Sequence, residues 1–460
     1  MATELLAPAG TLKSMRYAFA YGADAVYAGQ PRYSLRVRNN EFNRLEVLTE
    51  ACREAHEQGK QFYLASNLSP HNNKVRTYLK DLEPVIAMKP DALIMSDPGL
   101  IMMVRETWPD QVVHLSVQAN AVNYATVKFW QRQGISRVIL SRELSLDEIE
   151  EIRQECPEME LEVFVHGALC IAYSGRCLLS GYMTHRDSNQ GACTNSCRWQ
   201  YNVHEARENV TGELIPTVNS ALGSSVSGVF DPSAQNLAAV SSPAQGDEIA
   251  VLLQEKTRPG EYMPAYEDEH GTYIMNSKDL RAVQHVERLV KMGIHSLKIE
   301  GRTKSHYYVG RTVQVYRKAI DDAVAGRPFN MNLMAELDHL ANRGYTEGFY
   351  RRHVPSEYQN YEDGTSVNLN QQFVGEGLGY DSRSGWLTVE VKNRFVTGEQ
   401  MEIITPKGNL NLKLEAMENL KGQAIDVAPG DGHTVRIPLP PGLSIPEDGA
   451  YTLVMSHRQS

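Results

Sequence analysis

The sequence contains little cysteine and lacks any long hydrophobic segment. Its 460 residues include six cysteines, and no apolar run approaches the ~18 residues that a membrane-spanning helix needs. Its first residues lack the basic segment and long apolar core of a secretory signal. We therefore expect a cytoplasmic protein without a membrane segment, in which clustered cysteines bind a metal or a cluster more often than they form disulfides.

An excess of positive charge is also absent, because the formal net charge is −10 at pH 7. This excludes a protein whose whole surface is basic and binds nucleic acid indiscriminately. A local basic cleft that binds one RNA is compatible with the same net charge. The chain also exceeds the ~250–300 residues at which a single core stops growing, so two or more domains are expected.

Short apolar strands and helices alternate through most of the chain. Glycine or proline ends a helix near residues 22, 90, 134 and 293, and an apolar strand follows each of them. Strands are predicted to begin near residues 4, 23, 62, 91, 112, 137, 161 and 296. This pattern predicts a (β/α)8 TIM-like barrel, with a doubly wound open sheet as the alternative.

The predicted barrel is the catalytic domain and covers residues 1–325. It is interrupted at about 205–260 by an inserted loop region rich in Ser, Gly, Asn, Pro and Ala. A linker helix and loop follow at 326–365. From 366 to 460 the hydrophobic period changes to two, which predicts a small C-terminal β-barrel domain.

Polar residues stand at or just past the ends of the predicted barrel strands, where the active site of such a barrel lies. Each can also be a loop residue or a helix cap. They are Tyr27, Asn67, Asp97, Gln118, Arg142, Glu143, His166, Glu300 and Arg302. The catalytic candidates among them are His166, Glu300, Arg142, Asn67 and Gln118.

Four of the six cysteines cluster in one stretch, at Cys170, Cys177, Cys193 and Cys197. Only the last pair has the short separation typical of structural zinc sites, and four thiolates also suit an iron-sulfur cluster. Zinc is therefore the second candidate. The stretch begins in the seventh predicted strand, so we expect the cysteines at the strand end where substrates bind. Cys52 and Cys156 have no close cysteine neighbour and are predicted to be inert.

Arginines accompany the clustered cysteines. Arg176 and Arg198 each adjoin one, and Arg186 lies between the two pairs. They can offset the negative charge of ligating thiolates, bind an anionic substrate, or face solvent.

Residues 162–170, Glu-Val-Phe-Val-His-Gly-Ala-Leu-Cys, and residues 175–180, Gly-Arg-Cys-Leu-Leu-Ser, resemble the signature of the U32 peptidase-like family. With Asn-Ser-Lys-Asp-Leu at 276–280 and Lys-Ile-Glu-Gly-Arg at 298–302, the chain is most similar to the prephenate-dependent tRNA hydroxylases of that family. The resemblance covers the barrel and the C-terminal domain. It implies hydroxylation of the wobble uridine in a tRNA anticodon loop to 5-hydroxyuridine.

The resemblance also implies a [4Fe-4S] cluster held by the four clustered cysteines, and prephenate as co-substrate. Prephenate is a dicarboxylate, which bidentate arginines would suit. The candidates, chosen by position, are Arg142, Arg176, Arg186 and Arg302, and Tyr27 is a further candidate to bind substrate. The candidates to contact the RNA are Arg351 and Arg352, in an aromatic segment between the domains. Lys392 and Arg394 of the β domain are two more. Arginine and lysine bind phosphate, and arginine and aromatic side chains stack on bases. An ordinary solvated surface is the alternative for the interdomain pair.

Other functions are weighed against this one. A U32-type peptidase would need protease residues, but residues 56–60 and 204–208 lack the second histidine of His-Glu-x-x-His, and no Gly-x-Ser-x-Gly elbow is found. A cysteine protease needs a thiolate beside a histidine, and His166 near Cys170 could serve, but four clustered thiols fit metal ligation better. The remaining alternatives are a zinc-binding scaffold and a hydroxylase or accessory acting on 23S rRNA cytidine or a ubiquinone precursor.

Overall fold

The computed structural model forms two compact units. The first comprises Met1–Gly167, Ala282–Leu340 and Asn368–Ser460, and the second comprises Ala168–Arg281 and Ala341–Val367. The residues that the structure describes are 3–34, 41–168, 172–173, 176–177, 201–208, 214–221, 249–255, 262–268, 271–274, 279–340, 344–351, 371–440 and 445–457.

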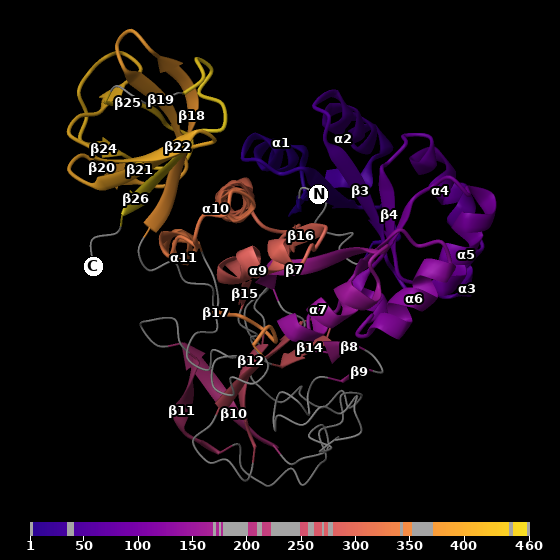
Figure 1. The fold of residues 1–460 in the computed structure, drawn as a ribbon. Helices are drawn as coiled ribbons and strands as arrows, with labels where there is room; N and C mark the ends of the chain where they lie inside the picture. The colour runs from indigo at the N-terminus through magenta and orange to yellow at the C-terminus, as the bar shows by residue number, and fades with distance from the viewer. Residues whose placement is uncertain are drawn as a thin grey trace. The chain divides into compact units, whose positions relative to one another are not determined.

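Parallel strands of the first unit close into an eight-stranded barrel (Figure 1). They are β1 (Glu4–Pro8), β2 (Ala25–Gly29), β3 (Gln61–Ser66), β4 (Ala92–Met95), β5 (Val113–Leu115), β6 (Arg137–Ile139), β7 (Glu160–Ala168) and β16 (Ser296–Ile299). Strand β16 pairs with β1 on one side and with β7 on the other, which closes the ring. The predicted TIM-like barrel and its eight strands are therefore confirmed.

Helices alternate with the barrel strands. They are α1 (Leu12–Ala20), α2 (Leu45–Glu57), α3 (Asn72–Val75), α4 (Tyr78–Ile86), α5 (Pro98–Thr107), α6 (Tyr124–Arg132), α7 (Leu146–Glu155), α9 (Val286–Lys291) and α10 (His306–Val324), and α11 (Asn332–Asp338) follows. Local sequence starts several of them. The Asp97 carboxylate accepts the Leu100 amide at the start of α5, and Ser145 and Glu148 form a capping box on α7. The cap interpretation of Asp97 is thus the correct one.

The second unit contains a five-stranded antiparallel sheet in the order β11-β10-β12-β13-β14. Its strands are β10 (Tyr201–Glu208), β11 (Leu214–Ala221), β12 (Ile249–Glu255), β13 (Tyr262–Asp268) and β14 (Gly271–Ile274). The unit also contains the antiparallel pair β8 (Ala172–Tyr173) and β9 (Arg176–Cys177), and β15 (Asp279–Arg281) parallel to β17 (Tyr345–Thr346). A loose insertion is predicted at about 205–260, but β11, β12 and part of β10 fall within those bounds.

The C-terminal part of the first unit is an antiparallel β domain, as predicted. Its main sheet has the order β22-β21-β26-β18-β19-β25-β23, and β20 pairs with β24. The strands are β18 (Gln371–Asp381), β19 (Trp386–Val391), β20 (Phe395–Val396), β21 (Gln400–Thr405), β22 (Gly408–Lys413), β23 (Glu418–Asn419), β24 (Val427–Ala428), β25 (Thr434–Pro438) and β26 (Leu453–His457). The alternation of buried residues in β19 and β25 fills one shared apolar core.

Helix α10 joins this β domain to the barrel through buried polar contacts. Arg311 of α10 is 1% exposed and forms an ion pair with Glu402 of β21, with Nη1 2.9 Å from Oε1. Glu376 of β18 accepts from Lys13 of α1 at 2.6 Å and pairs with His306 of α10 at 2.9 Å. These contacts hold the β domain to the wall of the barrel.

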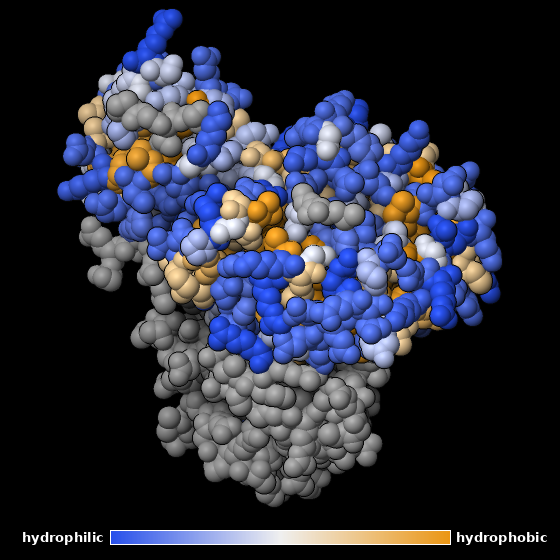
Figure 2. Space-filling view, in the orientation of Figure 1, coloured by the Kyte–Doolittle hydropathy of each residue, from blue (hydrophilic) through white to orange (hydrophobic). Residues whose placement is uncertain are grey.

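The described surface is largely polar on the face in view in Figure 2. Figure 2 shows hydrophilic residues over most of it, with hydrophobic residues scattered among them on the face in view. Among the described helices, none is long and apolar enough to cross a membrane.

Candidate active site at the carboxyl ends of the barrel strands

Charged side chains fill part of the barrel interior below the strand ends. Alternate residues of a barrel strand face inward, and Glu4, Arg137, Glu162 and Lys298 do so on four strands. Arg137 Nη1 lies 2.6 Å from Glu4 Oε1 and 3.3 Å from Glu162 Oε2, and Lys298 Nζ lies 2.7 Å from Glu162 Oε1. Burial lowers the pKa of Lys298, although Glu162 opposes this. Because each buried charge has a partner, the network is tolerated and supports the floor of the site.

Above this network Tyr27, Lys298 and Glu300 meet. Tyr27 is 3% exposed, and its hydroxyl lies 2.8 Å from Glu300 Oε2 and 3.0 Å from the Ile299 carbonyl oxygen. Lys298 Nζ lies 4.3 Å from the centre of the Tyr27 ring. The predicted site residues Tyr27 and Glu300 are thus in direct contact.

Arg302 follows Glu300 and is 9% exposed. Its Nη1 donates to Ser34 Oγ at 2.8 Å, and its guanidinium carbon lies 5.5 Å from the Tyr27 ring centre. The buried Nε of Arg302 has no hydrogen-bond partner among the described residues, and no ion pair of Arg302 is found there. A buried guanidinium without a carboxylate partner is unfavourable, which indicates an anionic ligand at this position.

Two glycines fix the backbone that carries Glu300 and Arg302. A Cβ on Gly10 would lie 2.0 Å from the Arg302 carbonyl oxygen, and one on Gly167 would lie 2.4 Å from the Glu300 carbonyl oxygen. Gly167 also has a φ of +103°, which L side chains rarely adopt. The strand ends therefore approach each other closely only because both positions lack a side chain.

A β-bulge changes the direction of His166. Phe164 pairs with Lys298, but His166 pairs with Ile299, so the register shifts between them. His166 consequently lies on the side of Ile299, where its ring is 5.8 Å from that of Tyr308 and 5.6 Å from that of Tyr316, both on α10. His166 thus packs against α10, and its catalytic role stays a prediction.

Neutral polar groups occupy the ends of β3, β4 and β5. Asn67 is 8% exposed, and its Nδ2 lies 3.4 Å from Ser116 Oγ, while Ser96 Oγ donates to the Asn67 carbonyl oxygen at 3.1 Å. The side-chain oxygens of Asn67 and Gln118 are buried without a hydrogen-bond partner among the described residues. These amides lack a group that ionises, so they suit hydrogen bonding to a ligand better than acid-base catalysis.

Arg142 lies after β6 and packs on an aromatic ring of the neighbouring strand. Its guanidinium carbon is 3.8 Å from the centre of the Phe164 ring, and Lys298 Nζ is 5.5 Å from the same ring. Glu143 accepts a hydrogen bond from Ser141. Arg142 thus shares Phe164 with Lys298 at this end of the barrel.

Several predicted residues lie outside the part of the chain whose side chains are described. Arg176 and Cys177 form strand β9, but their side chains are not among those described. The described residues also exclude Cys170, Cys193, Cys197, Arg186 and Arg352. The other two cysteines are buried, and burial raises the pKa of Cys52 to about 11 and that of Cys156 above its ordinary value. Both are therefore thiols at neutral pH, as expected of inert cysteines.

The predicted RNA-binding residues that are described lie on separate elements. Arg351 is exposed and pairs with Glu347 at 2.7 Å in the second unit. In the β domain, Lys392 lies 2.8 Å from Glu390, and Arg394 is exposed. The ion pair reduces the charge that Lys392 offers, so Arg394 is the stronger of these two candidates.

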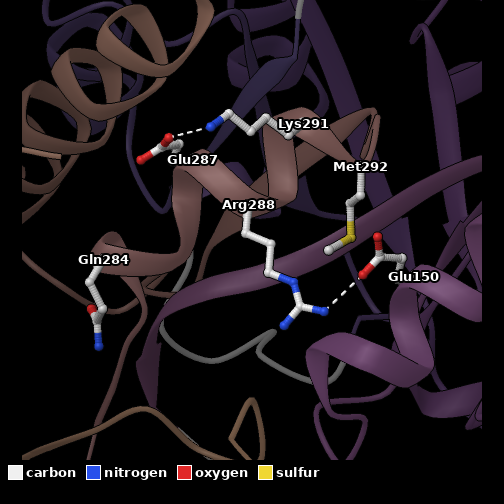
Figure 3. A pocket seen from close by; sticks show the side chains of 6 residues that line it. All are labelled: Glu150, Gln284, Glu287, Arg288, Lys291 and Met292. Atoms are coloured by element: carbon white, nitrogen blue, oxygen red, sulfur yellow. Dashed lines mark hydrogen bonds and ion pairs between the residues drawn. The ribbon is translucent and has the colours of Figure 1, made fainter. Parts of the chain in front are cut away.

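One hollow lies away from the strand ends, on helices α7 and α9 (Figure 3). Arg288 contacts Glu150 at 2.8 Å and Lys291 contacts Glu287 at 2.5 Å, so these charges are paired within the chain. The hollow is therefore a poor candidate for an ionic ligand site.

Comparison with known proteins gives the family. Residues 10–360 match Peptidase family U32, and residues 369–447 match the Peptidase family U32 C-terminal domain. This chain belongs to peptidase family U32. Among its U32 relatives, tRNA hydroxylation protein P of Escherichia coli (strain K12) is 61% identical over 453 residues, covering 98% of this chain and 96% of the relative.

Further relatives have similar names. tRNA hydroxylation protein P of Haemophilus influenzae (strain ATCC 51907 / DSM 11121 / KW20 / Rd) is 59% identical over 452 residues, covering 98% of this chain and 95% of the relative. tRNA hydroxylation protein P1 of Bacillus subtilis (strain 168) is 33% identical over 433 residues, covering 92% of this chain and 89% of the relative. The similarity therefore includes both the U32 barrel and the C-terminal domain.

Sequence reasoning missed two members of this U32 site, Ser34 and Lys298. Lys298 carried a detectable signal, because a lysine inside an otherwise apolar strand must find a buried partner. Ser34 carried none, since its contact with Arg302 joins residues far apart in the sequence.

Proposed function

We propose that this U32 chain is a tRNA hydroxylase that uses prephenate to convert the wobble uridine of the anticodon loop to 5-hydroxyuridine. The observation that carries the proposal is the near full-length similarity to tRNA hydroxylation protein P at 61% identity. The contact between Tyr27 and Glu300, with the buried Arg302 beside it, supports a site at the strand ends. In this proposal the anticodon loop presents its base to that end of the barrel.

A [4Fe-4S] cluster fits the thiols that this chain offers. Of the six cysteines, Cys52 and Cys156 are buried, and burial raises their pKa values, so they stay protonated thiols. The other four cysteines, which lie close together in the sequence, are then the candidate ligands. Cys170, Cys177, Cys193 and Cys197 would hold the cluster. Such a cluster supplies one-electron transfer.

Arg302 is the residue that we assign to a carboxylate of prephenate. Ser34 fixes one end of its guanidinium, while the buried Nε is available for a second, bidentate contact. Arg142, on the Phe164 ring, is the candidate for the other carboxylate. Arg176 and Arg186 stay predictions for the same role.

Glu300 is the residue that we assign to proton transfer. Hydroxylation is a two-electron oxidation in which the oxygen atom and the oxidant must come from outside the chain's own residues, and the proton that leaves the reacting carbon needs an acceptor nearby. Glu300 is 8% exposed and held by Tyr27, which suits that task. The amides of Asn67 and Gln118 would hydrogen bond to the bound base, and Arg351, Arg352 and Arg394 would contact the RNA backbone, with Lys392 contributing less.

Nucleoside analysis tests this function. A strain that lacks the protein should lose 5-hydroxyuridine and nucleosides derived from it in tRNA, and the wild-type gene should restore them. Glu300→Gln should fail to restore them while the protein folds normally. Unchanged tRNA nucleosides in the deletion strain, with loss of a modified cytidine in 23S rRNA or of ubiquinone, would instead favour those substrates.

Iron analysis tests the cofactor separately. Anaerobically purified protein should contain about four irons per chain, as a cysteine-ligated cubane requires. Cys177→Ala should lose most of this iron, whereas the matched variant Cys52→Ala should keep it. Zinc in place of iron in the wild-type protein would contradict the cluster.

A further inference from the structure

The hydroxyl of Tyr27 is shared between two acceptors of the same strand end. It lies 2.8 Å from Glu300 Oε2 and 3.0 Å from the carbonyl oxygen of Ile299. A phenol has one proton, so it can donate fully to only one of them at a time. The hydroxyl can therefore turn from one acceptor to the other without any movement of the ring.

Tyr27 stays a donor over the whole physiological pH range. Burial raises its pKa well above the ordinary value, and the Glu300 carboxylate raises it further. The ionised phenolate is thus disfavoured, and when Glu300 is ionised its Oε2 accepts a hydrogen bond from the phenol, which keeps its proton. A hydrogen bond donated to a carboxylate favours the ionised form of that carboxylate.

The ring of Tyr27 also touches the cations of the site. Lys298 Nζ lies 4.3 Å and the Arg302 guanidinium carbon 5.5 Å from the ring centre, and cations at such distances are attracted to the aromatic face. Arg142 also acts on Tyr27 electrostatically. Among the described residues, Lys298, Arg302 and Arg142 are therefore charged groups that act on Tyr27.

We propose that Tyr27 is a positioning residue that orients the Glu300 carboxylate and keeps it ionised for proton transfer. The inference rests on the proposed function, in which Glu300 accepts a proton from the substrate. When the carboxylate takes that proton, it becomes a carboxylic acid, and the Tyr27 O–H turns to the Ile299 carbonyl oxygen. When Glu300 returns the proton to solvent, the hydroxyl turns back, so each turnover ends with the starting arrangement.

This assignment changes the predicted role of Tyr27. As a substrate-binding residue it would offer its hydroxyl to the ligand, but that hydroxyl already has two partners and the side chain is almost fully buried. A positioning role predicts that loss of the hydroxyl affects turnover and its pH dependence. A substrate-binding role predicts an effect on KM instead.

The experiment compares Tyr27→Phe with Tyr78→Phe in the full-length holoenzyme, with tRNA and prephenate as substrates. Tyr78 of α4 is the matched control, because it is fully buried and its hydroxyl lies 2.8 Å from Ser66 Oγ of β3. We expect Tyr27→Phe to lower kcat roughly tenfold or more, the loss typical of one hydrogen bond to a charged group. Both KM values should stay near wild type, and the acid limb of the pH profile of kcat/KM should move to higher pH. Tyr78→Phe should change neither.

A second variant guards against a simple folding defect. Incorporation of 3-fluorotyrosine at position 27 keeps the ring and makes the phenol a stronger donor, so the acid limb should move to lower pH. Shifts in opposite directions for the two changes would support the positioning role. A Tyr27→Phe profile that superposes on wild type, or a raised KM at unchanged kcat, would overturn it.

Glu300→Gln separates this inference from the function on which it rests. An inactive Glu300→Gln with a wild-type Tyr27→Phe would overturn the positioning role and leave the proposed site intact. An active Glu300→Gln would overturn both, because Glu300 would then transfer no proton.

Discussion

Arg311 gives the sharpest prediction for the junction between the barrel and the β domain. Its Nη1 and Nη2 lie 2.9 and 3.3 Å from the two oxygens of Glu402, and its Nε donates to the Glu336 carbonyl oxygen. Glu402 also accepts from Gln371 at 2.9 Å and from Asn409 at 3.0 Å. The variant Arg311→Met removes the cation and keeps an apolar chain that packs in the same space.

The expected loss of unfolding free energy in Arg311→Met depends on the hydrogen bonds that Glu402 keeps. Removing one partner of a buried ion pair costs about 3–5 kcal/mol, because the other charge is left buried. Glu402 is 5% exposed but keeps two neutral donors, so we expect about 3 kcal/mol, the lower end of that range. The double variant Arg311→Met/Glu402→Leu should lose less unfolding free energy than Arg311→Met alone, since no unpaired carboxylate then stays buried.

Urea unfolding, followed by tryptophan fluorescence and circular dichroism, measures both variants. Burial raises the pKa of Glu402, but Arg311 outweighs this and holds the pKa below its ordinary value. The pair therefore stabilises the fold above the ordinary glutamate pKa, and this contribution decreases as pH falls. A loss below about 0.5 kcal/mol for Arg311→Met, the size of an ordinary surface substitution, would refute the reasoning.

Two further predictions concern other contacts of the first unit. Gly167→Ala should destabilise the protein by on the order of 1–3 kcal/mol and reduce hydroxylation, because its Cβ would meet the Glu300 carbonyl oxygen at 2.4 Å. Gly59→Ala is the matched control for thermal unfolding and activity, since it has a positive φ but open space around the Cβ. Burial raises the pKa of Glu376, but hydrogen bonds from His306 and Lys13 outweigh it and lower the pKa to about 2. This contribution to stability is present above the ordinary glutamate pKa and is lost as pH falls toward 2. The urea midpoint should therefore depend less on pH in Glu376→Gln than in the wild type. Equal pH dependence in the two proteins would contradict the stabilising role of Glu376.

The barrel could be predicted from the sequence because its signals are local. Each strand is a short apolar run, and glycine or proline ends several of the preceding helices, so chain order alone fixes a parallel arrangement. The same reasoning placed Tyr27, Glu300 and Arg302 at the strand ends, and the structure brings these three together.

His166 shows what local sequence signals leave open, and its catalytic role stays a prediction. Counting alternate residues along β7 from Phe164 directs His166 into the barrel, but one bulge at the pairing with Ile299 reverses its side. A bulge depends on how two distant strands pair, which a single sequence does not reveal. The ion pairs of Glu162 with Arg137 and Lys298 are hidden for the same reason, since each joins residues distant in the chain.

Hydroxylation of tRNA at the barrel site can be tested directly. Anaerobically purified wild-type protein and Glu300→Gln can be incubated with prephenate and with tRNA from a strain that lacks the gene, followed by mass spectrometry of the nucleosides. We predict that the wild type adds one oxygen to the wobble uridine, and that Glu300→Gln, with equal iron content and thermal stability, adds none. Hydroxylation by Glu300→Gln at the wild-type rate, or none by the wild type with its cofactor intact, would contradict the account.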